Sequence, residues 1–352
     1  MRNHIIFFSG GLSSFSVADY VKTKYPEDNI LLYFTDTRWE NEDLYRFIHE
    51  ASDKLQLPLL THSMGLNPIE LMFEQKVVFN SRIGNCSKYL KIKVAEDYLK
   101  KGKRPNIEVW RNKEYLRDND FITNATLYFG IGFMESHRAG PIQHNWSKRG
   151  KKGFKVEFPL IDLFIDNNLV LDKYSIRQPV LYDMGFSHNN CNGCCVKAGM
   201  AHFKRLRKEM PAVFNKLVEQ EHYIKLYVSE YHYIKNLEVD GLDNEVKALW
   251  HKQLDNSYRD YFYGRSSKPK VHIPTDLVIN QYSFMKRKGA AYPLAKFGRD
   301  LSGWKGFNYD KDDQFDLKHD EGGCGCFVDY GPTEISEENI IEQENNQFAL
   351  AL

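Results

Sequence analysis

The chain has 352 residues, of which 42% are hydrophobic and 27% charged, a composition that excludes a disordered chain. The formal net charge is +1, so the total gives no general attraction for nucleic acid. The first apolar run starts without a signal-peptide pattern, and no apolar stretch is long enough to cross a bilayer. We therefore expect a soluble, cytoplasmic protein with no membrane partner.

The first half of the chain alternates strand and helix patterns. Short apolar runs predict strands, and apolar residues at helical spacing predict the helices between them. The predicted strands are 5–8, 30–35, 57–61 and 125–130, and the predicted helices are 13–24, 42–55 and 87–99. This alternation predicts an α/β fold with a doubly wound parallel sheet that has helices on both faces.

The second half has a different character. Residues 101–124 are polar and charged, which favours an insertion into the α/β rhythm. Residues 203–233 and 246–263 predict two long, charged helices, and 268–274 predict a Pro-containing linker. We therefore expect a helical appendage behind the sheet.

A glycine pair follows the first predicted strand, in the turn that runs from Ser9 through Gly10 and Gly11 to Ser13 and Ser14. Glycine lets the backbone turn tightly and come close to a ligand. The helix that follows presents unpaired N–H groups and the positive end of its dipole. Together these features predict a phosphate site. An ordinary tight turn is the alternative that this segment alone leaves open.

Further motifs follow in chain order. Each is weak alone, but their order along residues 5–200 is specific. The motifs are Thr35-Asp36-Thr37 at the end of the second strand, Cys86-Ser87-Lys88 with Lys91, the group Gly132, Glu135, Ser136 and Arg138, Pro159–Asp162, and Leu181–Phe186 before Cys191.

The ordered set resembles the PP-loop superfamily of N-type ATP pyrophosphatases and sulfonucleotide reductases, in particular the phosphoadenosine-phosphosulfate reductase-like family. The chain departs from that pattern at Ser13, where many members have an Asp, so a ligand-orienting carboxylate is missing. It also lacks the Glu-Cys-Gly-Leu-His ending of the true reductases. The resemblance implies the adenine nucleotide alpha hydrolase-like fold, and the crevice rule for α/β sheets also places the nucleotide at the carboxyl ends of the strands.

The resemblance also implies the site residues. The cofactors it implies are ATP or a sulfonucleotide with Mg²⁺. Asp36, Lys91 and Arg138 are the catalytic candidates, although a surface ion pair is an equal alternative for Arg138. The expected nucleotide-binding residues are Ser9, Gly10, Gly11, Ser13, Ser14, Thr35, Asp36, Gly132 and Glu135.

Five of the six cysteines lie in two groups, Cys191, Cys194 and Cys195, then Cys324 and Cys326 between glycines. Separated cysteine groups in an intracellular chain are typical of a Cys₄ zinc site or an iron–sulfur cluster. Separate buried thiols are the alternative. The ligands that the resemblance favours are Cys191, Cys195, Cys324 and Cys326.

Two rival ligands remain. Cys194 competes with Cys195, and Cys86 stands where related assimilatory enzymes hold a cluster. Spacing does not choose between zinc and iron–sulfur, and the resemblance favours iron–sulfur.

We therefore predict a PP-loop enzyme that splits the α–β phosphate bond of ATP, adenylates an oxygen of an acceptor and releases pyrophosphate. A sulfur or nitrogen nucleophile then displaces AMP. The acceptor, a small molecule or a nucleic acid such as tRNA or DNA, stays open, as does the oligomeric state. One alternative is a true sulfonucleotide reductase whose thiolate lies on a mobile C-terminal arm. Another is a non-catalytic nucleotide sensor or nucleic-acid-binding module, which Ser13 and the basic turn 204–208 favour.

The expected domain organisation follows from these patterns. Residues 1–200 form the nucleotide-binding α/β domain. Residues 201–330 form a helical appendage that a Cys-rich metal segment closes. Residues 331–352 are an acidic, polar tail with no packing signal, which we expect to be disordered.

Overall fold

The computed structural model describes residues 1–80, 83–148, 153–237, 243–270, 279, 282–287 and 290–298. The segment around Cys324 and Cys326 and the predicted tail 331–352 lie outside the described residues. Of the helices in the described ranges, none is both long enough and apolar enough to cross a membrane.

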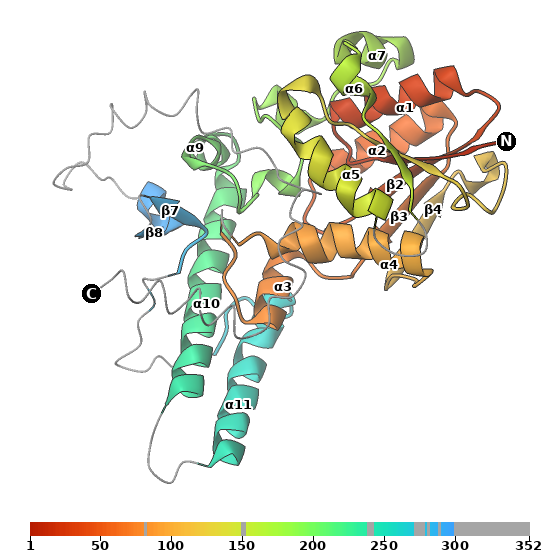
Figure 1. Ribbon diagram of the computed structural model, residues 1–352. Coiled ribbons are helices and arrows are strands. Elements are labelled where there is room, and N and C mark those ends of the chain that lie inside the picture. The colour runs from red at the N-terminus through yellow and green to blue at the C-terminus, as the bar shows by residue number, and fades with distance from the viewer. Residues whose placement is uncertain are drawn as a thin grey trace.

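A six-stranded sheet forms the centre of the first half, in the order β4-β3-β2-β1-β5-β6 (Figure 1). The strands β1, β2, β3, β5 and β6 are parallel, and β4 runs antiparallel to β3 at one edge. The predicted α/β fold is therefore confirmed, as a mixed rather than a wholly parallel sheet. The strands are β1 (Asn3–Phe7), β2 (Asn29–Thr35), β3 (Leu59–Ser63), β4 (Ile107–Arg111), β5 (Thr126–Phe129) and β6 (Lys155–Glu157).

Helices cover both faces of the sheet because the central strands are apolar on both faces. In β1, Ile6 belongs to one core and its neighbours Ile5 and Phe7 to the other, as the two-residue period of a strand requires. Helices α1, α2 and α7 pack on the first face, and α4 and α5 on the second. Their bounds are α1 (Leu12–Lys24), α2 (Glu42–Leu55), α7 (Asn167–Tyr174), α4 (Lys93–Lys101) and α5 (Ala139–Lys148), with the short helices α6 (Pro159–Asp162) and α8 (Val180–Asp183).

The predicted insertion at 101–124 is in part wrong. Its segment Ile107–Arg111 forms β4, which pairs with β3 from Leu59↔Arg111 to Ser63↔Ile107. An edge strand needs apolar cover on one face only, so its polar composition hides it from a search for apolar runs.

Two local features differ from the predicted helices. The predicted helix 87–99 consists of the π-helix η1 (Ser87–Ile92) followed by α4. The helix α3 (Pro68–Gln75) was not expected, although Asn67 and Glu70 form a capping box with Pro68 at its first position. Both differences lie beside the candidate site.

The predicted helix 203–233 is divided at Met210, where Pro211 begins a second helix. Proline has no N–H and suits the first turn of a helix, so it starts α10 instead of continuing α9. Helices α10 and α11 lie side by side and extend away from the sheet (Figure 1). The elements are α9 (Met200–Glu209), α10 (Pro211–Asn236), α11 (Asn244–Phe262) and the hairpin β7 (Met285–Arg287) with β8 (Ala290–Tyr292).

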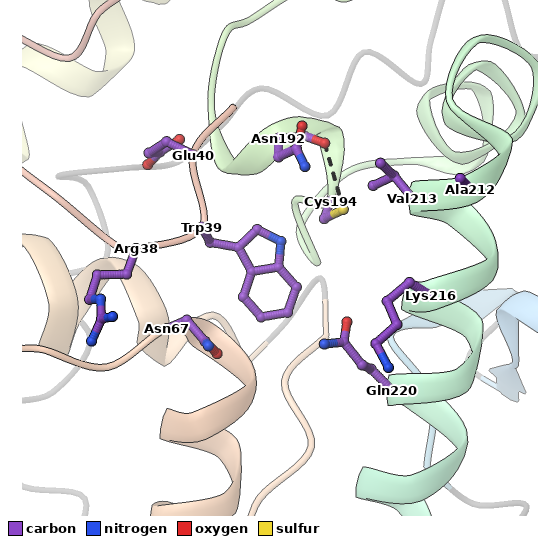
Figure 2. A pocket seen from close by; sticks show the side chains of 10 residues that line it. All are labelled: Arg38, Trp39, Glu40, Asn67, Asn192, Cys194, Ala212, Val213, Lys216 and Gln220. Atoms are coloured by element: carbon purple, nitrogen blue, oxygen red, sulfur yellow. Dashed lines mark hydrogen bonds between the residues drawn. The ribbon is translucent and has the colours of Figure 1, made fainter. Parts of the chain in front are cut away.

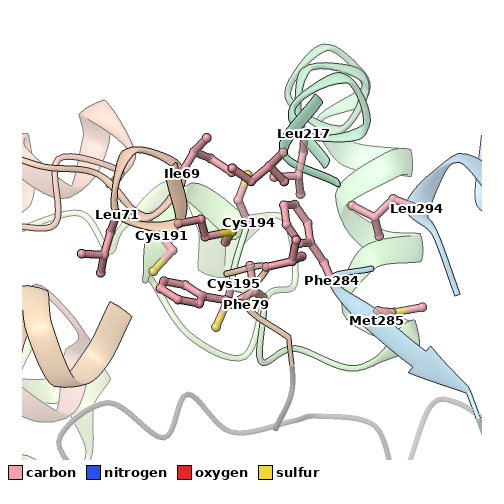
Figure 3. Close-up of a cluster of buried hydrophobic side chains, with 14 of the residues drawn as sticks. Ile69, Leu71, Phe79, Cys191, Cys194, Cys195, Leu217, Phe284, Met285 and Leu294 are labelled. Carbon is pink, nitrogen blue, oxygen red and sulfur yellow. The ribbon is translucent and has the colours of Figure 1, made fainter. Parts of the chain in front are cut away.

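A third core joins the helical part to the sheet side of the molecule. It packs α3 and the loop around Cys191 against α9, α10, α11 and the hairpin. Figure 3 shows the three cysteines of that loop among Phe79, Leu217 and Phe284. Residues before and after position 200 therefore share one apolar core, and the domain boundary there stays a prediction.

A buried carboxylate holds the hairpin on α10. Glu221 accepts hydrogen bonds from the backbone N–H groups of Phe284 at 2.8 Å and Leu294 at 2.7 Å. Burial raises the pKa of Glu221 to about 7, against these hydrogen bonds and the charge of Lys225, which lower it.

This shift predicts a pH dependence of stability. The pKa of Glu221 is about 7 in the folded chain and 4.5 ordinarily, so the folded state binds the proton more tightly. Stability that is present below pH 4.5 is lost as the pH rises to 7, by about 3 kcal/mol. Urea unfolding of wild type and Glu221→Gln at several pH values measures it. The difference in free energy of unfolding between the two proteins should change between pH 4.5 and pH 7. Parallel pH profiles of the two proteins would contradict the raised pKa of Glu221.

Candidate functional site

The order of the strands places a crevice at the carboxyl ends of β1 and β5. The chain leaves β1 toward β2 on one side and β5 toward β6 on the other, so the strand order reverses between them. Such a switch point is where open α/β sheets bind ligands. Gly130, directly after β5, lies so close to α1 that a Cβ there would be 2.7 Å from the backbone nitrogen of Ser14.

The predicted phosphate turn lies at this crevice. Gly10 has a φ of +76°, a conformation that favours glycine, and its carbonyl accepts a hydrogen bond from the Asn189 amide at 3.0 Å. Gly11 is the N-cap of α1 and has no side-chain hydrogen bond to the helix. The hydroxyl of Ser14 turns back to the Gly11 carbonyl at 2.8 Å, and Ser9 lies 3.4 Å from it. The dipole end of α1 thus faces the crevice without a carboxylate or amide cap.

The end of β2 brings a carboxylate to the same edge of the sheet. Thr35 is buried, and Asp36 follows it. Asp36 Oδ1 accepts hydrogen bonds from the Arg38 N–H at 2.7 Å and the Tyr45 hydroxyl at 2.8 Å. Ser63, at the end of β3, donates to the Asp36 carbonyl at 2.8 Å. The predicted motif around Asp36 is therefore held in place by α2 through Tyr45 and by the end of β3 through Ser63.

Glu40, which the sequence did not single out, connects this loop to two other segments. Its side chain is 1% exposed and lies 3.6 Å from Lys91 Nζ, in the π-helix. Its oxygens accept hydrogen bonds from the Thr37 hydroxyl at 2.9 Å and the Cys191 N–H at 2.5 Å. The loop after β2, the π-helix and the cysteine loop therefore meet at one carboxylate.

Lys91 lies among the cysteines as well as beside Glu40. Burial lowers the pKa of this amine, whereas the nearby groups Glu40, Cys191, Cys86 and Cys195 raise it. The raising effects are larger in sum, so the pKa of Lys91 is raised. A buried lysine that stays protonated needs partners of this kind. The structure thus brings together Cys86, Cys191 and Cys195 around one cation.

The thiols of Cys191 and Cys195 form a hydrogen-bonded pair. This hydrogen bond is the largest of the effects that lower the pKa of Cys195 to about 7; the Lys197 backbone and Lys91 also lower it, while burial raises it. The pKa of Cys191 is raised well above its usual range by the same hydrogen bond, by burial and by Glu40. Cys195 is therefore the more acidic thiol of the pair.

The other two described cysteines carry thiols. Burial is the largest effect on both and raises the pKa of Cys86 and of Cys194 to about 12. The Trp39 side chain lowers the pKa of the Cys194 thiol in part. Within the described ranges, no three Cys, His, Asp or Glu side chains are arranged so that they could hold a metal ion. The expected ligands Cys324 and Cys326 lie outside those ranges.

The segment after β5 forms the opposite wall. Gly132 caps the 3-10 helix η3 (Phe133–Arg138), in which Glu135 pairs with Arg138. The Arg138 side chain is 14% exposed and the Glu135 side chain is 41% exposed. The two residues thus form an ion pair in which Arg138 is mostly covered and Glu135 reaches the surface.

His188 lies in surroundings that are unusual for a histidine with a purely structural role. Both ring nitrogens are buried, and neither has a hydrogen-bond partner in another residue of the described part. Burial, then His202, Lys91 and Arg138, lower the pKa of His188 to about 3. A neutral imidazole with unpaired nitrogens thus lies near both cations of the site, one residue before the Asn189 that binds Gly10.

Residues 3–110 match the family model of the phosphoadenosine phosphosulfate reductase domain. This range contains the glycine turn, the Asp36 motif, Glu40 and Lys91. No curated protein sequence matches the chain. The match confirms the resemblance drawn from the motifs.

The pair of Glu40 and Lys91 generates a prediction about stability. Glu40→Gln keeps a hydrogen-bonding group for Cys191 but leaves the lysine charge buried, which costs about 3 kcal/mol. Lys91→Met in the Glu40→Gln background removes that unpaired charge and should recover part of the loss. Chemical unfolding of the three proteins measures both effects. A double variant no more stable than Glu40→Gln would show that the pair is not coupled.

Proposed function

We propose that this chain, a PP-loop protein of the phosphoadenosine-phosphosulfate reductase-like family through its residues 3–110, is an enzyme that binds ATP or a sulfonucleotide at the start of α1. The observation that carries the proposal is the uncapped N-terminus of α1 at the switch point. Backbone N–H groups and a helix dipole that meet in a crevice suit phosphate oxygens.

The two walls of the crevice suit the rest of the nucleotide. We assign Asp36 to the ribose or to a Mg²⁺ ion on the phosphates, since carboxylates are preferred ligands of that ion. Gly132, Glu135 and Arg138 form the wall beyond β5. The buried, unpaired nitrogens of His188 support a ligand contact between the walls.

The reaction we favour is adenylation. An acceptor oxygen attacks the α-phosphorus of ATP, the α–β bond breaks and pyrophosphate leaves. The α1 amides and Arg138 stabilise the negative charge that grows on the leaving group. Lys91 has a different part, because its charge faces Glu40 and the thiols. We assign it to stabilising Cys195 as a thiolate, which attacks the activated carbon of the acceptor while the bond to AMP breaks and AMP leaves.

One observation favours a second candidate, the sulfonucleotide reductase. Cys195, the more acidic of the paired thiols, lies in the loop that Glu40 holds to the end of β2. Its thiolate attacks the sulfate sulfur, and the bond to the nucleotide phosphate breaks. Incubation with labelled ATP and an acceptor extract, or with a labelled sulfonucleotide and a thiol reductant that frees sulfite from the S-sulfonated cysteine, separates the two. AMP with pyrophosphate supports adenylation, sulfite supports reduction, and binding without either product supports a sensor.

A zinc ion or iron–sulfur cluster at the cysteines remains a proposal. The described part supplies Cys191 and Cys195 as a contacting pair with Cys86 nearby, which is short of a complete ligand set. No step of the reaction is therefore derived through such a group.

Metal analysis of anaerobically purified variants tests the shared cysteine site. Cys191→Ser and Cys326→Ser should each lose the same metal, because both residues are proposed to bind it and a site that loses a ligand binds more weakly. Cys194→Ser decides between the rival ligands, because wild-type metal content in this variant leaves Cys195 as the ligand and lost metal assigns the ligand to Cys194. Full metal in either of the first two variants would rule out a shared site.

The close approach at Gly130 predicts a selective loss of nucleotide binding. Gly130→Ala forces β5 and the start of α1 apart, because its Cβ would meet the Ser14 backbone. Calorimetric titration with ATP and Mg²⁺ should show affinity reduced at least about tenfold, or 1.4 kcal/mol. Gly140→Ala in α5 has open space around its Cβ and is the matched control. Equal ATP affinity in both folded variants would contradict the proposed site.

A further inference from the structure

A second hollow lies beside the nucleotide crevice, between the sheet side and the helical part. Its volume is about 480 Å³, within the range of small-molecule sites. It opens between the loop after β2, the start of α3, the cysteine loop and α10 (Figure 2). The lining residues used here are Arg38, Trp39, Asn192, Cys194, Lys216 and Gln220.

The accessible charge in this pocket is positive. Arg38 and Lys216 are exposed and come from opposite walls. Glu40 also lines the pocket, but its carboxylate is buried and satisfied by Lys91 and the Cys191 N–H. Lys216 lies 3.1 Å from Glu219, an exposed pair on the same helix of the kind that water and salt weaken. The pocket therefore suits an anionic ligand.

A flat aromatic surface occupies the middle of the pocket. Figure 2 shows the indole of Trp39 between Arg38 on one side and Lys216 with Gln220 on the other. Cys194 Sγ donates to the Asn192 carbonyl at 3.6 Å, and Figure 2 shows the indole of Trp39 with its nitrogen toward this part of the cysteine loop. Asn192 and Gln220 add amide groups, which pair with both donors and acceptors. An indole face with amides around it suits a planar heterocycle.

We propose that this pocket binds a nucleotide unit of the acceptor, with its base on Trp39 and its phosphate beside Lys216. The proposal rests on the proposed function in one respect, that an acceptor must reach the crevice. The loop Asp36–Glu40 separates the two sites and contributes to both, so an occupant of the pocket lies next to the bound ATP. A free nucleotide and a nucleotide within a single strand present the same chemistry.

The test uses the full chain with the first site saturated by a non-hydrolysable ATP analogue and Mg²⁺. Uridine monophosphate and a short oligouridylate are titrated by calorimetry, because a pyrimidine probe does not compete for an adenine site. Trp39→Leu should reduce affinity about tenfold, whereas Trp39→Phe, which keeps a stacking face, should retain most of it. Lys216→Glu should also weaken binding, and Lys252→Glu, an exposed lysine on α11, should not.

The outcomes separate the two proposals. Binding of either probe that is weakened by the Trp39 and Lys216 variants supports the pocket. Tighter binding of uridine monophosphate indicates a free nucleotide as the ligand, and tighter binding of the oligouridylate indicates a single strand. Absence of binding by both probes, or equal binding by all variants, overturns it. ATP affinity measured on the same variants should stay that of wild type, so a failure of ATP to bind wild type would overturn the nucleotide crevice alone.

Discussion

Glu40 is a buried carboxylate that three segments must satisfy at once. A charge removed from water is costly unless it is paired and hydrogen-bonded, and here Lys91, Thr37 and the Cys191 N–H provide those contacts. The loop after β2, the π-helix and the cysteine loop can therefore not shift independently. That constraint sets the distance between the strand ends of the sheet and the thiols.

The same constraint links the two binding regions. Asp36 at the crevice and Trp39 in the pocket lie on either side of a loop that Glu40 fixes. The cysteine loop is fixed at its other flank by Asn189, which binds the Gly10 carbonyl. A displacement of the phosphate turn would therefore reach the cysteine loop through Asn189. A displacement of the loop after β2 would reach it through Glu40.

The sheet and its turn were predictable from the sequence, because apolar periodicity and glycines are local signals. The helix Glu42–Leu55 has the predicted bounds, since Asn41 caps its start. The antiparallel strand β4 and the break at Met210 were not predicted, the first because an edge strand is polar and the second because charge masked the Pro211 signal. Glu40 and His188 were missed as site residues because their roles depend on contacts over about 50 to 150 residues of sequence. Only the fold brings such residues together.

A crystal structure with a non-hydrolysable ATP analogue and Mg²⁺ tests most directly whether the nucleotide binds at the start of α1. We expect phosphate oxygens within hydrogen-bonding distance, about 3 Å, of backbone nitrogens in the first turn of α1, with Asp36 facing the ribose or the ion. A nucleotide bound elsewhere, with the first turn of α1 in contact with water alone, would contradict it.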